Sequence, residues 1–314
     1  MQANGRDHPE VLGNGHGNGN GNGHGLGIGN GNGHGNGHGL MSGTPAASAA
    51  ARCSGSDLLR WLGMAHEAGS RADQVVFPMR RVRTGTLVVH EGAPLESLYF
   101  ISAGTFKSVH TDPDGYELVQ GFLARGDVIG LDGLSDGVYG GDAIALEDAT
   151  VAIVTFRELI SASRTVPALE QLIFLASGRE IRRKNHTLEV MAAVGAEVRL
   201  ARFLLQLISR QVEQGYSARR MVLRMSRRDI ASHLGIAHET VSRSLTALAD
   251  WGYIGVNHRE IEILDGDGLE RFKRVTRGPT IKPPGGRGGA TRRARIQAAA
   301  TAALQGPESA SIGT

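Results

Sequence analysis

The segment IAHETVSRSL (236–245), with Thr246 after it, carries polar side chains whose types and spacing could contact nucleic-acid bases. Four of them recur at i, i+3, i+4 and i+7: Glu239, Ser242, Arg243 and Thr246. Residues at these spacings share one helix face. Arginine donates two hydrogen bonds to O6 and N7 of guanine, glutamate accepts one from N4 of cytosine, and hydroxyl groups contact bases or phosphates. The pattern indicates either a base-reading helix or an exposed helix with a surface ion pair between Glu239 and Arg243.

The residues around this segment predict a helix–turn–helix followed by a β-hairpin wing. Ser226 and Asp229 form a capping-box pattern that begins a first helix, and Gly235 permits a tight turn after it. Apolar residues at helical spacing would give both helices an inward face: Ile230, Ala231, Leu234, Val241, Leu245 and Leu248. The segment YIGVNHREIEIL (253–264) alternates as a two-stranded wing does. The second helix of such a motif enters the major groove of DNA, so this setting favours base reading over a surface ion pair.

We therefore assign base reading to Glu239, Ser242 and Arg243, and we expect double-stranded DNA to be a partner. Neighbouring imidazole, hydroxyl and guanidinium groups are expected to support DNA binding: His238, Thr240, Thr246, Arg227 and Arg228.

The chain between residues 75 and 155 has a different pattern. Short apolar runs such as TLVVHEG, SLYFISAG and ATVAIVTF alternate with glycine-containing turns, and DPDG (112–115) is a strong hairpin turn. Turn signals at intervals of roughly 8–12 residues predict a small antiparallel barrel or jelly roll.

The segment VPALEQLIFLASGREIRRKNHTLEVMAAV (166–194) predicts one long helix with a narrow apolar seam. The seam residues follow a short heptad pattern: Phe174, Ile181, Lys184, Leu188 and Met191. The helix could pack on its own domain, but its many charged residues leave a seam that fits a two-stranded contact better. We therefore expect a homodimer, weakened where Lys184 would face its counterpart in the second copy.

These patterns predict an α+β chain with defined boundaries. The expected parts are a disordered Gly/Asn/His-rich arm (1–55), a jelly-roll sensor-like domain (56–162), a dimerisation helix (163–194), a winged helix-turn-helix (195–270) and a disordered basic tail (271–314). Glycine and asparagine offer too little apolar area in the arm to offset the entropy of ordering it.

This order of parts resembles the CRP/FNR superfamily of bacterial transcription regulators, whose first domain is a cyclic-nucleotide-binding-like jelly roll. The resemblance covers roughly 77–272 and is most specific in three stretches: ESLYFISAGTFKSVHTDPDGYELVQGFLARGDVIGLDGL, GAEVRLARFLLQLISR and RRDIASHLGIAHETVSRSL. Within the superfamily, HETVSR is similar to the reading helix of the FNR and FixK branch. The resemblance implies a homodimer that recruits RNA polymerase at promoters of low-oxygen metabolism and binds inverted repeats of TTGAT. His238 stands where the cAMP-receptor branch has arginine, which argues against TGTGA half-sites.

The matching cyclic-phosphate stretch, IGLDGLSDGVYGGDAIAL (129–146), argues against cAMP as a cofactor. It contains neither arginine nor lysine, and Leu131 takes the place of the family's glutamate. A phosphate would therefore lie in a mostly apolar pocket without a cation.

The resemblance also implies two possible sensors, an iron–sulfur cluster held by cysteines and a haem group. Cys53 is the only cysteine of the chain, and Ala152 stands at the family's internal cysteine position. An all-cysteine cluster requires several thiolates, so we expect no 4Fe-4S cluster. Haem binding stays open, with His90 and His110 as histidines of the barrel. The favoured alternative is a FixK-like protein that senses no small ligand itself.

Composition limits the remaining classes. A net charge of +3 and a pI of about 9.2 neither require nor exclude nucleic acid. The single cysteine, the lack of a run near the roughly 20 apolar residues of a membrane span, and the lack of a secretion leader predict a cytoplasmic protein with no membrane partner. We find no nucleophile–base pair or phosphate-cradling loop and expect no enzyme. The other hypotheses are a regulator gated by haem, nitric oxide or another small molecule, and a protein-partner module with a vestigial helix-turn-helix.

Overall fold

The structure is a computed structural model that describes residues 51–64 and 69–274. The predicted arm before residue 51 and most of the predicted basic tail lie outside the described residues. None of the described helices has the length and apolarity that a membrane span requires.

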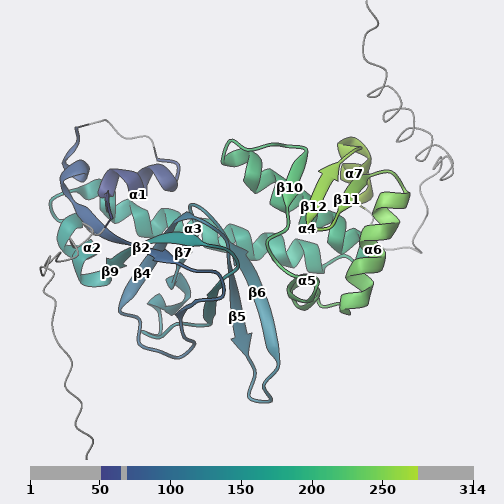
Figure 1. Ribbon diagram of the computed structural model, residues 1–314. Coiled ribbons are helices and arrows are strands. Elements are labelled where there is room, and N and C mark those ends of the chain that lie inside the picture. Colours follow the sequence, from purple (N-terminus) through teal and green to yellow (C-terminus); the bar gives the residue numbers. More distant parts are fainter. Residues whose placement is uncertain (1–50, 65–68, 275–314) are drawn as a thin grey trace, which may run out of the picture. The chain divides into compact units, whose positions relative to one another are not determined.

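The N-terminal part folds as a jelly roll of two antiparallel sheets, as predicted (Figure 1). One sheet has the order β1 (Arg52–Ser54), β2 (Val76–Val82), β9 (Ala149–Thr155), β4 (Ser97–Ala103) and β7 (Val128–Ile129). The other has the order β3 (Leu87–Val89), β8 (Asp142–Ala145), β5 (Phe106–Thr111) and β6 (Glu117–Leu123). Gly115 closes the predicted β5–β6 turn with a positive φ of 79°, and its N–H donates to the carbonyl of Asp112 at 2.7 Å. Buried side chains such as Ile101, Phe106 and Val151 fill the roll.

Short helices cap the roll before the long helix begins. They are α1 (Gly55–Trp61), a 3-10 turn (Arg71–Gln74), a 3-10 turn (Leu131–Leu134) and α2 (Phe156–Ser163). The long helix α3 runs over Pro167–Met191, inside the predicted span of 166–194. Pro167 explains its start, because a proline disfavours helical backbone in the preceding residue, and Val166 is not helical, with φ −131° and ψ 87°. The face of α3 that carries Leu169, Leu172 and Ala176 is buried against the roll.

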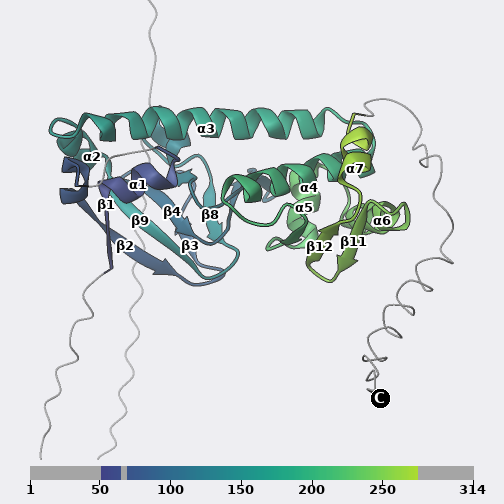
Figure 2. The same cartoon turned by 90° about the horizontal axis from the view of Figure 1, so that it is seen from above.

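The C-terminal part is the predicted winged helix-turn-helix. Its elements are α4 (Ala196–Glu213), β10 (Arg220–Val222), α5 (Arg227–Leu234), α6 (His238–Asp250), β11 (Ile254–Asn257), β12 (Glu260–Ile263) and α7 (Gly266–Phe272). The wing has a third strand, β10, which pairs with β12 and which the sequence did not indicate. Figure 2 shows α3 continuing from the roll to this part, with α4 alongside its C-terminal half.

The fold extends beyond both predicted boundaries. Cys53 lies in strand β1 opposite Phe77 and is buried, so the folded part begins before residue 56 and the predicted arm of 1–55 extends too far. A three-residue strand is too short to show alternation in the sequence. At the other end Phe272 is buried, and its ring centroid lies 5.5 Å from that of Trp251.

The first helix of the helix-turn-helix packs on the edge of the roll, as Figure 1 shows for α5 and β6. Strand β6 is the last of its sheet, so its outer N–H and carbonyl groups need partners from elsewhere. Ser232 accepts from the N–H of Val119 at 2.9 Å and donates to the carbonyl of Glu117 at 3.1 Å. The ring of His233 meets Phe122 edge-on, with centroids 5.2 Å apart. Side chains of α5 thus bond to the outer backbone groups of Glu117 and Val119 at this edge of the sheet.

Candidate nucleic-acid interface

Helix α6 has one apolar face and one polar face, as its sequence predicted. Val241, Leu245 and Leu248 are buried against the other helices of the domain. The four polar residues on the opposite face are exposed: Glu239, Ser242, Arg243 and Thr246. Ala237 occupies the N-cap without a side-chain hydrogen bond, so the backbone N–H groups of the first turn have no side-chain cap.

Glu239 and Arg243, on the exposed face of α6, do not pair with each other. Nδ1 of His238 lies 3.3 Å from Oε1 of Glu239, and Arg243 donates to Oγ1 of Thr240 at 3.4 Å. The surface ion pair between Glu239 and Arg243 is therefore not formed in the described helix. Both charges, and with them the hydroxyl of Ser242, remain available to a ligand on the solvent side.

A tight turn fixes α6 relative to α5. Gly235 takes the left-handed conformation at φ 60° and ψ 41°, which a residue with a β-carbon rarely adopts. Arg199 of α4 donates to the carbonyl of Leu234 at 3.0 Å and to that of Ala193 at 2.7 Å. The guanidinium of Arg199 thus connects the turn between α5 and α6 with the segment that follows α3.

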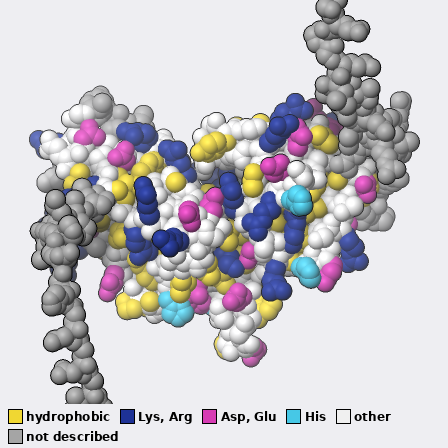
Figure 3. Space-filling view, viewed as in Figure 1, with side chains coloured by type: hydrophobic (Ala, Val, Ile, Leu, Met, Phe, Trp, Pro, Cys, Tyr) yellow, Lys and Arg dark blue, Asp and Glu magenta, His cyan; other side chains and the backbone are white. Residues whose placement is uncertain are grey.

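The two arginines expected to support DNA binding lie in different surroundings. Arg228 is exposed, whereas Arg227 donates to the carbonyl of His258 in the wing at 3.0 Å. Burial, and then the nearby charge of Arg259, lower the pKa of Arg227. Arg227 therefore holds the wing against α5. Figure 3 shows Lys and Arg side chains on the surface of this domain, with Asp, Glu and histidine between them.

The expected seam on α3 is partly exposed. Phe174, Ile181 and Leu188 expose 72%, 61% and 68% of their surface, which is unusual for large apolar residues spaced seven apart. Nζ of Lys184 lies 3.8 Å from Oε1 of Glu180, so its charge is partly balanced. Met191 lies instead beside Gly235 of the same chain, close to where a β-carbon at that glycine would point.

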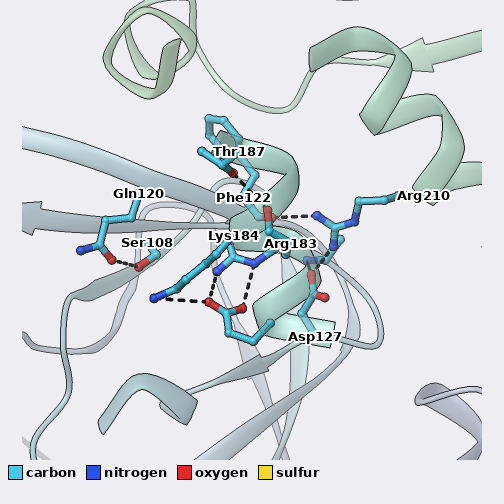
Figure 4. Close-up of polar contacts among 10 residues, drawn as sticks. Ser108, Gln120, Phe122, Asp127, Arg183, Lys184, Thr187 and Arg210 are labelled. Atoms are coloured by element: carbon cyan, nitrogen blue, oxygen red, sulfur yellow. Dashed lines mark hydrogen bonds and ion pairs between the residues drawn. The ribbon is translucent and has the colours of Figure 1, made fainter. Parts of the chain in front are cut away.

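The pocket inside the roll contains an ion pair that the sequence did not reveal (Figure 4). Arg183 of α3 donates to Glu180 at 2.5 Å and 2.9 Å, and these side chains are only 10% and 17% exposed. A β-carbon at Gly121 of β6 would overlap the Arg183 guanidinium. The space that remains beside Gln120 and Tyr139 measures about 20 Å³, room for about one water molecule. The contact between Gly121 and Arg183 could not be predicted from the sequence, because the two residues are far apart in it and neither local pattern indicates the other.

The candidate haem residues, His90 and His110, are engaged by carboxylates. Nδ1 of His90 lies 2.8 Å from Asp142, and Nδ1 of His110 lies 2.5 Å from Glu91. Burial raises the pKa of the Cys53 thiol to about 11, with a further contribution from Asp57. Among the described residues there is no group of three or more His, Cys, Asp or Glu side chains that could hold a metal ion. With one cysteine in the chain, and Ala152 fully buried in β9, the residues present do not fit an all-cysteine cluster.

Comparisons with known proteins identify both domains. The family model of the Crp-like helix-turn-helix domain matches residues 198–272, and that of the cyclic nucleotide-binding domain matches residues 79–164. The chain is 33% identical over 229 residues to the transcriptional regulatory protein btr of Bordetella pertussis, which covers 73% of this chain and 95% of that protein. It is 32% identical over 205 residues to the fumarate and nitrate reduction regulatory protein of Escherichia coli K12, which covers 65% of this chain and 82% of that protein.

A solved structure agrees with these sequence matches. FixK2 from Bradyrhizobium japonicum superposes with a TM-score of 0.56 at 28% identity, covering 66% of this chain and all of that chain. The chain therefore belongs to the CRP/FNR family of transcription regulators and binds DNA through its helix-turn-helix. Its relatives are regulators and not enzymes.

Proposed function

We propose that this protein is a homodimeric regulator of the FNR/FixK type that reads TTGAT-like inverted repeats with α6. It recruits RNA polymerase in the bacterial cytoplasm, at promoters of low-oxygen metabolism, and needs no cyclic nucleotide. The observation that carries the proposal is the exposed face of α6, where Glu239, Ser242 and Arg243 point away from the core and no ion pair joins Glu239 to Arg243.

The residue types on α6 support the half-site. Arg243 matches the guanine of TTGAT, and Glu239 matches the cytosine that pairs with it on the other strand. The similarity to the fumarate and nitrate reduction protein and to FixK2 supports the same branch. His238 occupies the position where the cAMP-receptor branch has arginine, so TGTGA is disfavoured.

Two further features support a dimer that acts without a nucleotide. The exposed apolar stripe of Phe174, Ile181 and Leu188 offers a second copy an apolar seam. The Glu180–Arg183 pair occupies space in the roll that a ligand would need, and the small remaining volume of about 20 Å³ supports a regulator that acts without a nucleotide. The inverted repeat follows from the two-fold symmetry of such a dimer.

Binding of purified protein to short duplexes tests this function. The duplexes carry inverted repeats of TTGAT, inverted repeats of TGTGA, or a scrambled sequence, and each is titrated in air with and without cAMP. We expect tight binding to the TTGAT duplex alone, unchanged by cAMP. Binding that requires cAMP, or haem added in a parallel titration, would show a ligand-gated regulator. Equal, weak binding to all three duplexes would favour a module that acts on a protein partner.

A further inference from the structure

A second pocket lies where the roll, α3 and α4 meet. Its volume is about 320 Å³, within the range of small-molecule sites, roughly 300–1,000 Å³. We call it the junction pocket, and the residues that carry the argument are Arg125, Arg179, Arg182, His186, Gln206 and Glu213. None of its lining residues belongs to α5, α6 or the wing, so it is separate from the proposed reading surface.

The junction pocket carries more positive charge than its carboxylates balance. Three lining arginines are each engaged by a carboxylate: Arg60 by Asp57, Arg183 by Glu180 and Arg210 by Asp127. Among the described residues, Arg125 and Arg182 have no carboxylate within ion-pair distance, and Arg179 donates only to the carbonyl of Gly126 at 3.4 Å. Glu213 is the one lining carboxylate that the described residues leave without a cation. A hollow in which positive charge predominates focuses the electrostatic field and attracts anions.

A second copy of the chain on the proposed seam would leave this pocket open. Arg179, Arg182 and His186 are spaced i, i+3 and i+7 and share one face of α3. At about 100° per residue, His186 lies about 140° around the helix from Ile181, and Arg179 about 160°. The cationic face is therefore turned away from the apolar stripe.

A buried polar atom marks the inner wall of the pocket. Oε1 of Gln206 is shielded from solvent and has no hydrogen-bond partner among the described residues. A buried amide without a partner is costly, and its oxygen and nitrogen ends can be exchanged by rotation. A ligand with hydrogen-bonding oxygens would satisfy this group as well as the guanidinium groups beside it.

We propose that the junction pocket binds a small polyanion of the phosphate type, held by Arg125, Arg179 and Arg182. Guanidinium groups bind phosphate oxygens through pairs of parallel hydrogen bonds. Such a site therefore selects its ligand by shape as well as by charge. Because Arg125 belongs to the roll, Arg182 to α3 and Gln206 to α4, one bound anion would contact all three. It would therefore stabilise their arrangement in the folded protein.

Inorganic pyrophosphate is the probe, and the full chain without DNA is titrated calorimetrically at constant ionic strength. The variant Arg125→Ala/Arg182→Ala removes two exposed side chains that have no ion-pair partner among the described residues, so its fold should be retained. We expect at least about a tenfold loss of pyrophosphate affinity in this variant. The control is Arg157→Ala, which removes an exposed arginine of α2 that lies outside the pocket and should bind as the wild type does.

Thermal unfolding gives a second readout, because a ligand that binds only the folded state raises its unfolding temperature. Pyrophosphate should raise the unfolding temperature of the wild type and of the Arg157→Ala control but not that of the double variant. No binding to the wild type, or equal binding to the double variant, would overturn the proposal. Neither measurement uses DNA, so the outcome is independent of the proposed half-site.

Discussion

Nζ of Lys107 in the roll lies 2.8 Å from Oδ1 of Asp229 at the start of α5, and the two side chains are only 17% and 13% exposed. The other oxygen of the same carboxylate accepts from the backbone N–H of Ser226 at 2.9 Å, which completes the capping box of the first helix, and from the Ser226 hydroxyl at 2.6 Å. The carboxylate of Asp229 therefore caps the first helix of the helix-turn-helix and also binds this helix to the roll through Lys107. Burial by itself raises the pKa of Asp229, but the hydrogen bonds from Lys107 and Ser226 lower it more.

Replacing Lys107 with methionine tests the value of this contact. The change leaves the capping box but removes the partner of a largely buried carboxylate, so we expect a loss of about 1–3 kcal/mol in the free energy of unfolding in urea. Lys273→Met is the matched control, because its ion pair with Glu270 is exposed and should be worth less than about 1 kcal/mol. Equal stability of both variants would show that the Lys107 contact contributes nothing.

His233 predicts a pH dependence of stability. Burial lowers its pKa below the ordinary value of 6.5, although the carbonyl of Val119 opposes this shift. As the pH falls through 6.5 the unfolded chain takes up the proton first, so the stabilisation is complete above this pH and declines towards the lower folded pKa. The variant His233→Gln should lose less stability than the wild type between pH 7.5 and about pH 5.5, within the range that histidine titrates. His258→Asn changes an exposed histidine of the wing and should keep the wild-type dependence of unfolding free energy on pH. If His258→Asn also weakens this dependence, burial of His233 is not its cause.

The contact between Gly121 and Arg183 predicts a non-additive pair of substitutions. In Gly121→Ala the new methyl group must displace the guanidinium from Glu180, which should cost about 1 kcal/mol of unfolding free energy. In the background Arg183→Ala the same change should cost nothing, because the obstructing side chain is gone. Gly255→Ala, whose β-carbon would meet only ordinary contacts at 3.7 Å or more, is the control. Additive effects in the two backgrounds would show that Arg183 does not occupy this space.

The exposed stripe on α3 predicts the assembly state. Ile181→Glu places a charge in the proposed seam and should shift the protein from dimer to monomer in sedimentation equilibrium. Arg157→Glu, on exposed α2, should leave the mass unchanged. A wild-type protein that sediments as a monomer at all concentrations would contradict the seam.

Local patterns predicted much of this molecule. Capping of α5 by Ser226, the turn at Gly235 and the inward face of α6 depend on neighbours in sequence, and the structure has all three. The contacts that join distant segments could not be predicted in this way. Lys107 and Asp229 are 122 residues apart, and nothing in either local pattern indicates the other. Strand β1 could not be predicted because its three residues give no periodicity, so the predicted arm of 1–55 wrongly includes the buried Cys53.

The most direct test of the account is whether Arg243 reads a base. The affinities of wild type and Arg243→Ala are compared on a TTGAT palindrome and on one whose guanines are replaced by adenines, with no ligand added. Wild type should prefer the guanine duplex by about 1–3 kcal/mol per half-site, and Arg243→Ala should lose that preference. Arg228→Ala, at an exposed position of α5, should weaken binding to both duplexes equally. If Arg243→Ala keeps the preference for guanine and only weakens binding overall, Arg243 contacts phosphate and the proposed reading by α6 is wrong.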